Sequence, residues 1–249
     1  MAQSDGQTNN HNTGENVIPP SRWGLDIEVD EKLVRQNLLE IQNKIAHCKP
    51  RIIGVTKYYG LSAMISGYKA GLRDFGESRA IDAIKKIENL PAEIRENSKF
   101  HFIGHLQTNK VDKVVKHFDF IQSVDSLHLA AAISDSAVKQ NKSINLLLQL
   151  NNACEEQKFG YSKETMISEL PEILKLRNIN IKGLMNMAPL GASEEVLKTL
   201  FSDVRSFRDK LEKMFGIKLP ELSMGMSDDY EIAVNEGATM IRVGRKLFT

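Results

Sequence analysis

The sequence has little cysteine and few aromatic residues. Of its 249 residues only two are cysteines, Cys48 and Cys154, and 6% are aromatic. The two cysteines lie far apart and form no C-x-x-C pair. They therefore exclude a disulfide-stapled fold and a zinc site made of cysteines. Cysteine usage of this kind is typical of a reducing compartment.

An excess of charge of one sign and long hydrophobic runs are also absent. There are 33 Lys and Arg against 32 Asp and Glu, a formal net charge of +1. This balance argues against a nucleic-acid-binding protein, which concentrates positive charge on one face. The most apolar run, at 144–150, is shorter than the roughly 18 residues of a membrane helix, and the N-terminus does not have the pattern of a secretory signal. We expect a cytoplasmic protein with neither nucleic acid nor membrane as a partner.

The first 22 residues differ in composition from the rest of the chain. They are rich in Asn, Gln, Ser and Gly and poor in apolar residues, as disordered segments are. We expect a disordered tail over 1–22 and a single domain over 23–249. A chain of this length is close to the roughly 250 residues of a (β/α)₈ barrel and buries a core that needs no disulfide or metal.

After the tail, short apolar runs alternate with longer amphipathic ones. The pattern predicts eight strands, at 52–56, 74–76, 101–104, 120–123, 145–149, 181–185, 221–223 and 239–243. It also predicts helices between them, at 62–71, 79–89, 109–116, 126–140, 163–176, 193–215 and 228–236. Such alternation predicts a parallel sheet with helical crossovers, here a closed TIM (β/α)₈ barrel. No glycine-rich dinucleotide or P-loop motif is present to favour an open sheet.

An additional helix is predicted before the first strand. Asp30 is a suitable N-cap for a helix over 30–48, whose apolar face contains Val34, Leu38, Ile41 and Ile45. The chain ends just past the eighth strand, which leaves little room for an eighth barrel helix. We expect helix 30–48 to pack on the barrel wall and cover that gap.

In barrels of this class, active groups come from the C-terminal ends of the strands and the loops that follow. These places are residues 56–57, 76–77, 104–107, 123–125, 151–152, 185–187, 223–227 and 242–245. The last two segments follow strands seven and eight, where barrels commonly bind phosphate on backbone N–H groups. Lys85 and Lys86, on a predicted helix, are expected to be exposed.

Lys57 is the most informative single residue. It follows an apolar strand and is expected to project into the barrel mouth, the open end at which the strands terminate. A lysine there, partly removed from water, is a competent amine nucleophile for a carbonyl, and a Schiff base opposite a phosphate site suits pyridoxal 5′-phosphate (PLP). The alternative is a lysine whose ammonium simply extends to solvent. Position alone leaves both interpretations open.

His101 and His105 are four residues apart. Their segment is a predicted strand that ends at a glycine, so the two rings do not share a helical face, and as a metal pair they lack a third ligand. We expect His101 to be packed inside the protein and His105 to line the mouth.

Seven segments of the sequence resemble one known family. They are GVTKYYG (54–60), DFGESRA (74–80), HFIGHLQTNK (101–110), SVDSLHLA (123–130), LLLQLNNACEEQKFG (146–160), IKGLMNMAP (181–189) and LSMGMSDDYEIAVNEGATMIRVGRKLF (222–248). The family that they resemble is that of the pyridoxal phosphate homeostasis proteins, and the similarity runs from about residue 33 to the C-terminus. HFIGHLQTNK and LSMGMSDD in that order are its most specific parts.

The resemblance implies a fold like the barrel domain of alanine racemase and a PLP cofactor bound as a Schiff base on Lys57. It implies a phosphate site made of Ser223 and the backbone amides of Gly244 and Arg245. Arg242 is then expected to face the pyridine nitrogen, with Met224 and Gly225 lining the approach. The family usually has Asn after FGE, whereas this chain has Ser78, so no role is transferred to that side chain.

The cofactor does not by itself make the protein an enzyme. Racemisation needs proton donors or acceptors on both faces of the bound amino acid; Lys57 serves one, and in the related racemases a second domain supplies the other. The sequence therefore favours a PLP-binding homeostasis protein, monomeric, with PLP-accepting apoenzymes as candidate partners. Two alternatives stay open: a single-domain PLP-dependent amino-acid racemase, and a cofactor-free barrel that binds another phosphorylated metabolite.

Overall fold

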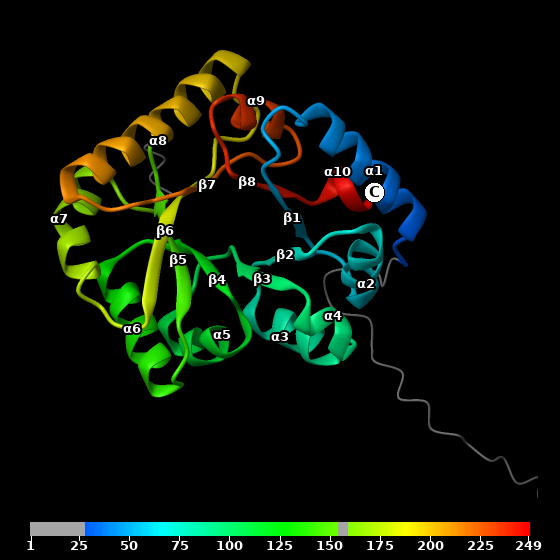
Figure 1. Cartoon of the computed structure of the whole chain (residues 1–249), viewed down its shortest axis with the longest axis horizontal. Helices are drawn as coiled ribbons and strands as arrows, with labels where there is room; N and C mark the ends of the chain where they lie inside the picture. Colours follow the sequence, from blue (N-terminus) through cyan, green and yellow to red (C-terminus); the bar gives the residue numbers. More distant parts are fainter. Residues whose placement is uncertain (1–27, 154–158) are drawn as a thin grey trace, which may run out of the picture.

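The computed structural model describes residues 28–153 and 159–249. Eight parallel strands form a closed barrel in the order β1 to β8, and Figure 1 shows the helices arranged around the outside of the ring. The predicted TIM (β/α)₈ barrel is confirmed. The strands are β1 Arg51–Val55, β2 Asp74–Glu77, β3 Lys99–Phe102, β4 Phe120–Val124, β5 Ile144–Leu150, β6 Ile179–Asn186, β7 Glu221–Ser223 and β8 Met240–Val243.

The helices agree with the sequence prediction in place and differ at their ends. They are α1 Glu31–Lys44, α2 Leu61–Ala70, α3 Ala80–Asn89, α4 Ala92–Glu96, α5 Val111–His117, α6 Leu127–Lys139, α7 Lys163–Ile173, α8 Glu194–Phe215, α9 Tyr230–Asn235 and α10 Arg245–Phe248, with a 3₁₀ turn η1 at Thr108–Lys110. The short helices α4 and α10 were not predicted, and the start of the helix predicted at 109–116 is the 3₁₀ turn η1. Each has five residues or fewer, too few for a helical repeat of apolar residues to show.

Two hydrophobic clusters lie on opposite sides of the sheet. The larger one lies between the strands and the helices, and the smaller one fills the inside of the barrel. The inner cluster consists of Ile53, Phe120, Leu147, Met185 and Met240. A packed interior of this kind leaves the strand ends as the place for a site.

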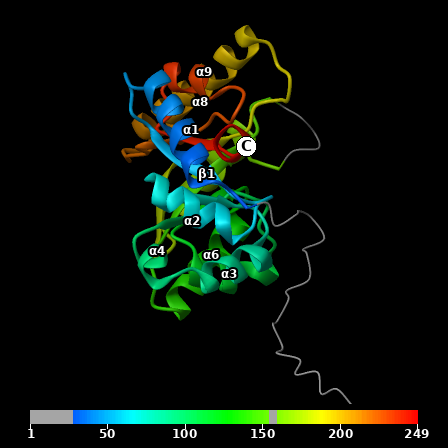
Figure 2. The ribbon, with the colours of Figure 1, turned by 90° about the vertical axis from the view of Figure 1, so that its right-hand side faces the viewer.

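The helix before the first strand covers the gap at the end of the barrel, as predicted. Asp30 caps α1 by accepting a hydrogen bond from the Lys32 backbone N–H. In Figure 2 α1 crosses the front of the molecule between α2 and α9. Asn37 Nδ2 donates to the Leu247 carbonyl in α10 at 3.2 Å, and Lys44 pairs with Glu231 in α9 at 3.0 Å. The one-turn helix α10 and α1 together occupy the place of an eighth barrel helix.

Two sequence predictions fall partly or wholly outside the described residues. The predicted tail over 1–22 lies wholly outside them, and the predicted domain over 23–249 does so in part, at 23–27 and at 154–158, which include Cys154. Cys48 lies in the turn that follows α1 and is a free, exposed cysteine. Among the described helices none has the length and apolar character needed to cross a membrane.

Candidate functional site at the barrel mouth

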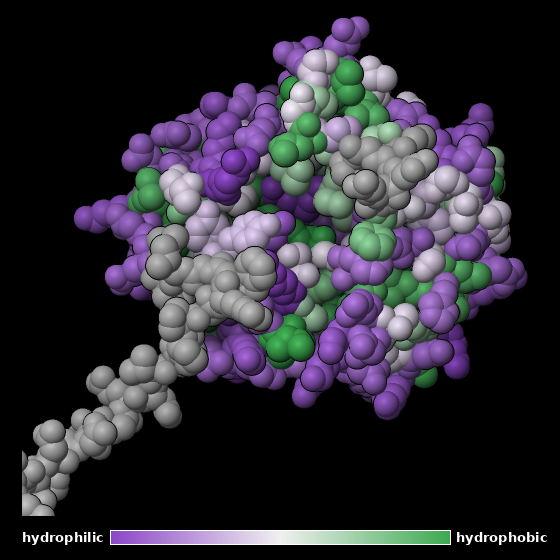
Figure 3. Space-filling view, turned by 180° about the vertical axis from the view of Figure 1, so that it is seen from behind, coloured by the Kyte–Doolittle hydropathy of each residue, from purple (hydrophilic) through white to green (hydrophobic). Residues whose placement is uncertain are grey.

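Three neighbouring strands bring the predicted site residues to one end of the barrel. β1 pairs with β8, and β8 pairs with β7. Because these strands are parallel, Lys57, the segment 223–227 and the segment 242–245 all lie where the strands end. Figure 3 views this end of the molecule, opposite to the view of Figure 1; the surface is hollowed near its centre and hydrophilic residues crowd its edge.

A buried ion pair between Lys86 and Glu77 restrains the loop that carries Lys57. Lys86 Nζ donates to the carbonyl oxygens of Thr56 at 2.9 Å and Tyr59 at 3.1 Å, on either side of Lys57 in sequence. It also pairs with the Glu77 carboxylate, which accepts a hydrogen bond from Thr56 Oγ1 at 2.7 Å. The three bonds that Lys86 makes, to Thr56, Tyr59 and Glu77, use all three N–H donors of its ammonium.

The prediction that Lys86 is exposed is therefore wrong. Its side chain is only 15% exposed, and Glu77 is 1% exposed. Burial raises the pKa of the Glu77 carboxyl, and the Lys86 ammonium and the Thr56 hydroxyl oppose that rise. Sequence reasoning missed this pair because Lys85 and Lys86 are adjacent, and only the helix phase, which turns Lys86 toward the sheet, tells them apart.

Arg242 lies fully inside the mouth. It is 3% exposed, and burial lowers the pKa of its guanidinium to about 10, an effect that the Asp229 carboxylate opposes. Its Nη1 donates to the carbonyl oxygen and the hydroxyl of Ser223, at 2.7 and 2.8 Å, and its Nη2 donates to the Asn186 carbonyl at 2.8 Å. At pH 7 the guanidinium stays positively charged and is fixed across the ends of β6, β7 and β8.

The two serines of the SMGMS segment have different places. Ser223 is fully buried, and its hydroxyl donates to Gln122 Oε1 at 2.7 Å and accepts from Arg242. Ser227 lies at the mouth, where its Oγ accepts a hydrogen bond from the Gly244 N–H at 3.4 Å. Sequence reasoning chose Ser223; the serine beside the predicted phosphate amides is Ser227.

Met224 and Gly225 shape the turn after β7 and do not present side chains to the mouth. Met224 is fully buried in the larger cluster, so its side chain does not line the mouth. Gly225 has a φ of 90°, and a Cβ there would lie 2.6 Å from Ala233 Cβ. Only glycine fits at this turn. Its carbonyl accepts from the Arg242 backbone N–H at 3.0 Å, so the turn ties the loop after β7 to β8.

The side chains of Arg245 and His105 lie at the rim. Arg245 pairs with Asp228 at 2.7 Å, with both side chains mostly exposed; this contact joins the loops after β7 and β8. His105 stacks on Phe159 with ring centroids 3.7 Å apart. His101, as predicted, is packed inside the barrel and has no exposed surface.

One buried acceptor at the mouth is left without a protein donor. Asn152 Nδ2 donates to Leu200 O and Asp203 Oδ2, so its Oδ1 faces Asn186 Nδ2 and accepts from it at 2.6 Å. This fixes the Asn186 amide with its Oδ1 on the other side. No donor among the described residues reaches that buried oxygen. A ligand that presents an O–H or N–H group there would complete it.

The comparisons with known proteins agree on one family. The family described as alanine racemase, N-terminal domain, matches residues 29–249. A pyridoxal phosphate homeostasis protein of Synechocystis sp. is 40% identical over 198 residues, which cover 80% of this chain and 90% of that protein. The chain belongs to the pyridoxal phosphate homeostasis protein family. A further family member, from Aquifex aeolicus, is 36% identical over 198 residues, covering 80% of this chain and 86% of that protein. The resemblance inferred from the seven sequence segments is confirmed.

Solved structures agree with this family membership. PipY of Synechococcus elongatus, in a structure with PLP bound, superposes with a TM-score of 0.80 at 36% identity, over 87% of this chain and 100% of that one. An alanine racemase of Clostridium difficile shares the fold, with a TM-score of 0.70 at 18% identity over 88% of this chain and 57% of that one. The barrel of this chain therefore has the fold of the alanine racemase barrel domain.

Proposed function

We propose that the protein binds PLP in the barrel mouth as part of intracellular PLP homeostasis, with Lys57 as the residue that bonds to it. The observation that carries the proposal is that Lys57, the buried Arg242 and the Ser227–Gly244 pair lie at the same end of the barrel. The solved structure of the family member PipY with PLP bound supports it. The Lys57 amine adds to the aldehyde carbon of PLP, and loss of one water leaves a C=N bond. No oxidant or reductant is required.

The phosphate group fits the loops after β7 and β8. The N–H groups of Gly244 and Arg245, at the start of α10, and the Ser227 hydroxyl are the donors that we assign to it. The proposal moves the serine role from Ser223 to Ser227, because the Ser223 hydroxyl already bonds to Gln122 and Arg242. The free Asn186 Oδ1 suits a ligand with a hydroxyl on its ring, which PLP has.

Arg242 supports a carrier over an efficient amino-acid enzyme. A charged guanidinium beside the pyridine nitrogen disfavours protonation of that nitrogen. A neutral pyridine withdraws electrons less strongly, so a carbanion on a bound amino acid gains less stabilisation. The side chain's burial and its three hydrogen bonds hold it in place.

The alanine racemase likeness supports a second candidate, a PLP-dependent amino-acid racemase. Purified protein that racemises alanine or serine at a rate abolished by Lys57→Ala would establish it over the carrier. A monomeric state and transfer of PLP to acceptor apoenzymes are further parts of our proposal. Size-exclusion chromatography and activation of a PLP-dependent apoenzyme by the loaded protein test them.

The deciding experiment is titration of the purified protein with PLP, followed by borohydride reduction and mass spectrometry. We expect a visible absorption band and, after reduction, a stable PLP adduct on Lys57. Both are lost in Lys57→Ala and retained in Lys246→Ala, which removes an exposed lysine of α10. A colourless protein, or a band that survives in Lys57→Ala, contradicts the proposal.

A further inference from the structure

A row of buried polar side chains runs through the barrel beneath Arg242. It begins at Asp74 on β2 and passes through His101 on β3 and Gln122 on β4 to Ser223 on β7. The contacts are His101 Nε2 to Asp74 Oδ1 at 2.8 Å, Gln122 Nε2 to His101 Nδ1 at 2.9 Å and Ser223 Oγ to Gln122 Oε1 at 2.7 Å. The last three residues are fully buried, so water does not compete for these bonds.

The direction of every bond in this row follows from its two ends. A guanidinium only donates, so the Ser223 hydroxyl accepts from Arg242 and gives its own hydrogen to Gln122 Oε1. A carboxylate only accepts, so His101 donates from Nε2 to Asp74. The Gln122 NH₂ group must therefore face His101, and its oxygen must face Ser223. The Ser223 hydroxyl gives its hydrogen to Gln122 and presents a lone pair to Arg242 Nη1, 2.8 Å away.

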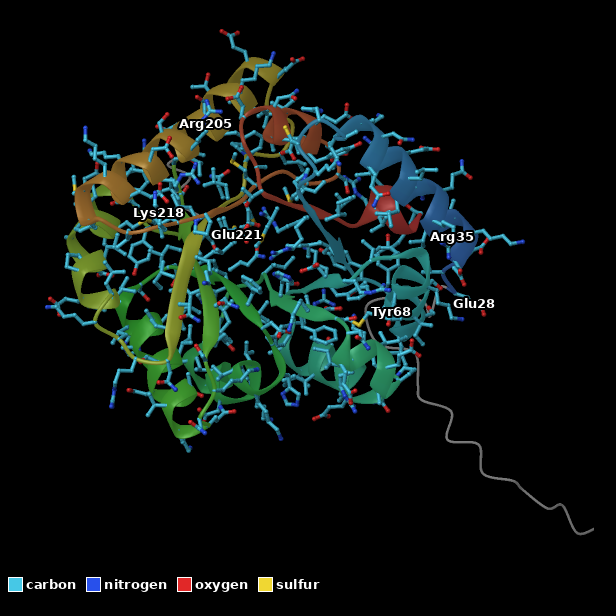
Figure 4. All side chains as sticks on the ribbon, viewed as in Figure 1. Glu28, Arg35, Tyr68, Arg205, Lys218 and Glu221 are labelled. Atoms are coloured by element: carbon cyan, nitrogen blue, oxygen red, sulfur yellow. The ribbon has the colours of Figure 1, made fainter. Side chains whose placement is uncertain are left out.

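The far end of the row is anchored at the opposite face of the barrel. Arg51 lies between the carboxylates of Asp74 and Glu221, with N–O distances of 3.7 and 3.5 Å. Figure 4 labels Glu221, which lies near the middle of the ring of strands on the face where the strands begin. Phe120 stacks on the His101 ring with centroids 4.6 Å apart, and this contact restrains the ring between its two partners.

We propose that His101 and Gln122 are positioning residues: through Ser223 they fix the Arg242 guanidinium in the place from which it faces the ring nitrogen of bound PLP. This inference rests on the proposed function. Without Gln122, the Ser223 hydroxyl loses the acceptor for its hydrogen and can turn that hydrogen toward the guanidinium. Arg242 then loses an acceptor inside a dry site, where a replacement from water is not at hand.

The test compares Gln122→Met, Ser223→Ala and the double variant with the wild type, all titrated with PLP. Met has nearly the length of Gln but no amide, so the change removes the bonds with little loss of volume. We expect the visible absorption band of the bound cofactor to shift and its dissociation constant to rise roughly tenfold in each single variant. The two residues act in one chain, so the double variant is expected to bind no more weakly than Ser223→Ala alone.

A matched control separates positioning from loss of packing. Leu147→Met changes another fully buried residue of the barrel interior and is expected to keep the wild-type band and affinity. Wild-type band and affinity in Gln122→Met, or additive losses in the double variant, overturn the inference. If Gln122→Met does not fold, Ser223→Ala decides alone: an unshifted band overturns the inference.

Failure of the proposed function has a different result. In that case the wild-type protein itself forms no Lys57-dependent band, and both proposals fall together. A wild type with a Lys57-dependent band, beside a Gln122→Met variant that matches it, overturns only the positioning role.

Discussion

At the scale of single residues, the mouth depends on charges that are buried and partnered. Glu77 and Lys86 form one such pair, and Arg242 with its acceptors forms another. Removing one partner of a buried ion pair leaves the other charge without compensation, which is far more costly than losing an exposed pair. The exposed pair of Arg245 and Asp228, by contrast, adds little to stability.

Lys86→Met is predicted to destabilise the protein more at pH 8 than at pH 5. Burial raises the pKa of the Glu77 carboxyl in the folded state above its value in the unfolded chain. The stability that the protonated carboxyl contributes is therefore fully present below the unfolded-state pKa and is lost as the pH rises through the folded-state pKa. Removing the ammonium raises that pKa further. We expect a loss of about 3–5 kcal/mol in the free energy of unfolding at pH 8, and a smaller loss at pH 5, measured by urea denaturation.

The matched control for this prediction is Lys85→Met, on the exposed side of the same helix. It is expected to change the free energy of unfolding by about 0.5 kcal/mol or less at both pH values. A loss in Lys86→Met that is the same at pH 5 and pH 8 contradicts the linkage to Glu77.

The sequence locates the site but does not assign all its parts. Lys57 and the segments 223–227 and 242–245 are found by the rule that barrel sites lie at strand ends. The choice between Ser223 and Ser227, and the burial of Lys86, depend on which way each side chain points. Single positions in a loop or at the edge of a helix face do not determine that direction. Gln122 carried no signal at all, since one buried amide in an apolar strand has no pattern.

At the scale of elements, strands such as β5 and β8 are predictable because each is a short apolar run between polar turns. β2 and β7 have a single large apolar side chain each and are found from their place in the strand–helix alternation. Helix starts are marked as well: Ser126, Ser162 and Ser193 each cap a helix through their side chains. Helix α9 begins at Tyr230 and not at 228 as predicted, because Asp229 accepts from the Met226 N–H and holds a turn there. This contact is local, between residues three apart in the chain, and aspartate favours turns and caps over helix interiors.

The packing of α1 on the barrel wall gives a prediction with a neighbouring control. Leu38 is 4% exposed, and Leu39 is 57% exposed. Leu38→Ala leaves a cavity beside the C-terminal end of α2 and is expected to lower the free energy of unfolding by about 2–5 kcal/mol. Leu39→Ala is expected to change it by about 0.5 kcal/mol or less. Equal losses in the two variants, measured by chemical denaturation, mean that α1 does not pack on the barrel wall through Leu38.

At the scale of the whole molecule, the two ends of the barrel carry different functional groups. The face where the strands begin holds the ion pairs of Arg51 with Asp74 and Glu221. The face where they end holds Lys57, Arg242 and the loops after β7 and β8. The net charge of +1 hides this arrangement, since a few placed cations matter more here than their sum. A cytoplasmic location and a monomeric state stay predictions.

PLP is predicted to stabilise the whole fold, because a ligand that binds only the folded state shifts unfolding by mass action. At 100 times its dissociation constant the gain is about 2.7 kcal/mol, which corresponds to a rise of roughly 5–10 °C in Tm for a domain of this size. Pyridoxal at the same concentration has the aldehyde but no phosphate, so the donors of Ser227, Gly244 and Arg245 have nothing to hold. We expect it to raise Tm by clearly less. Differential scanning calorimetry decides: equal shifts with the two ligands mean that the loops after β7 and β8 do not bind phosphate.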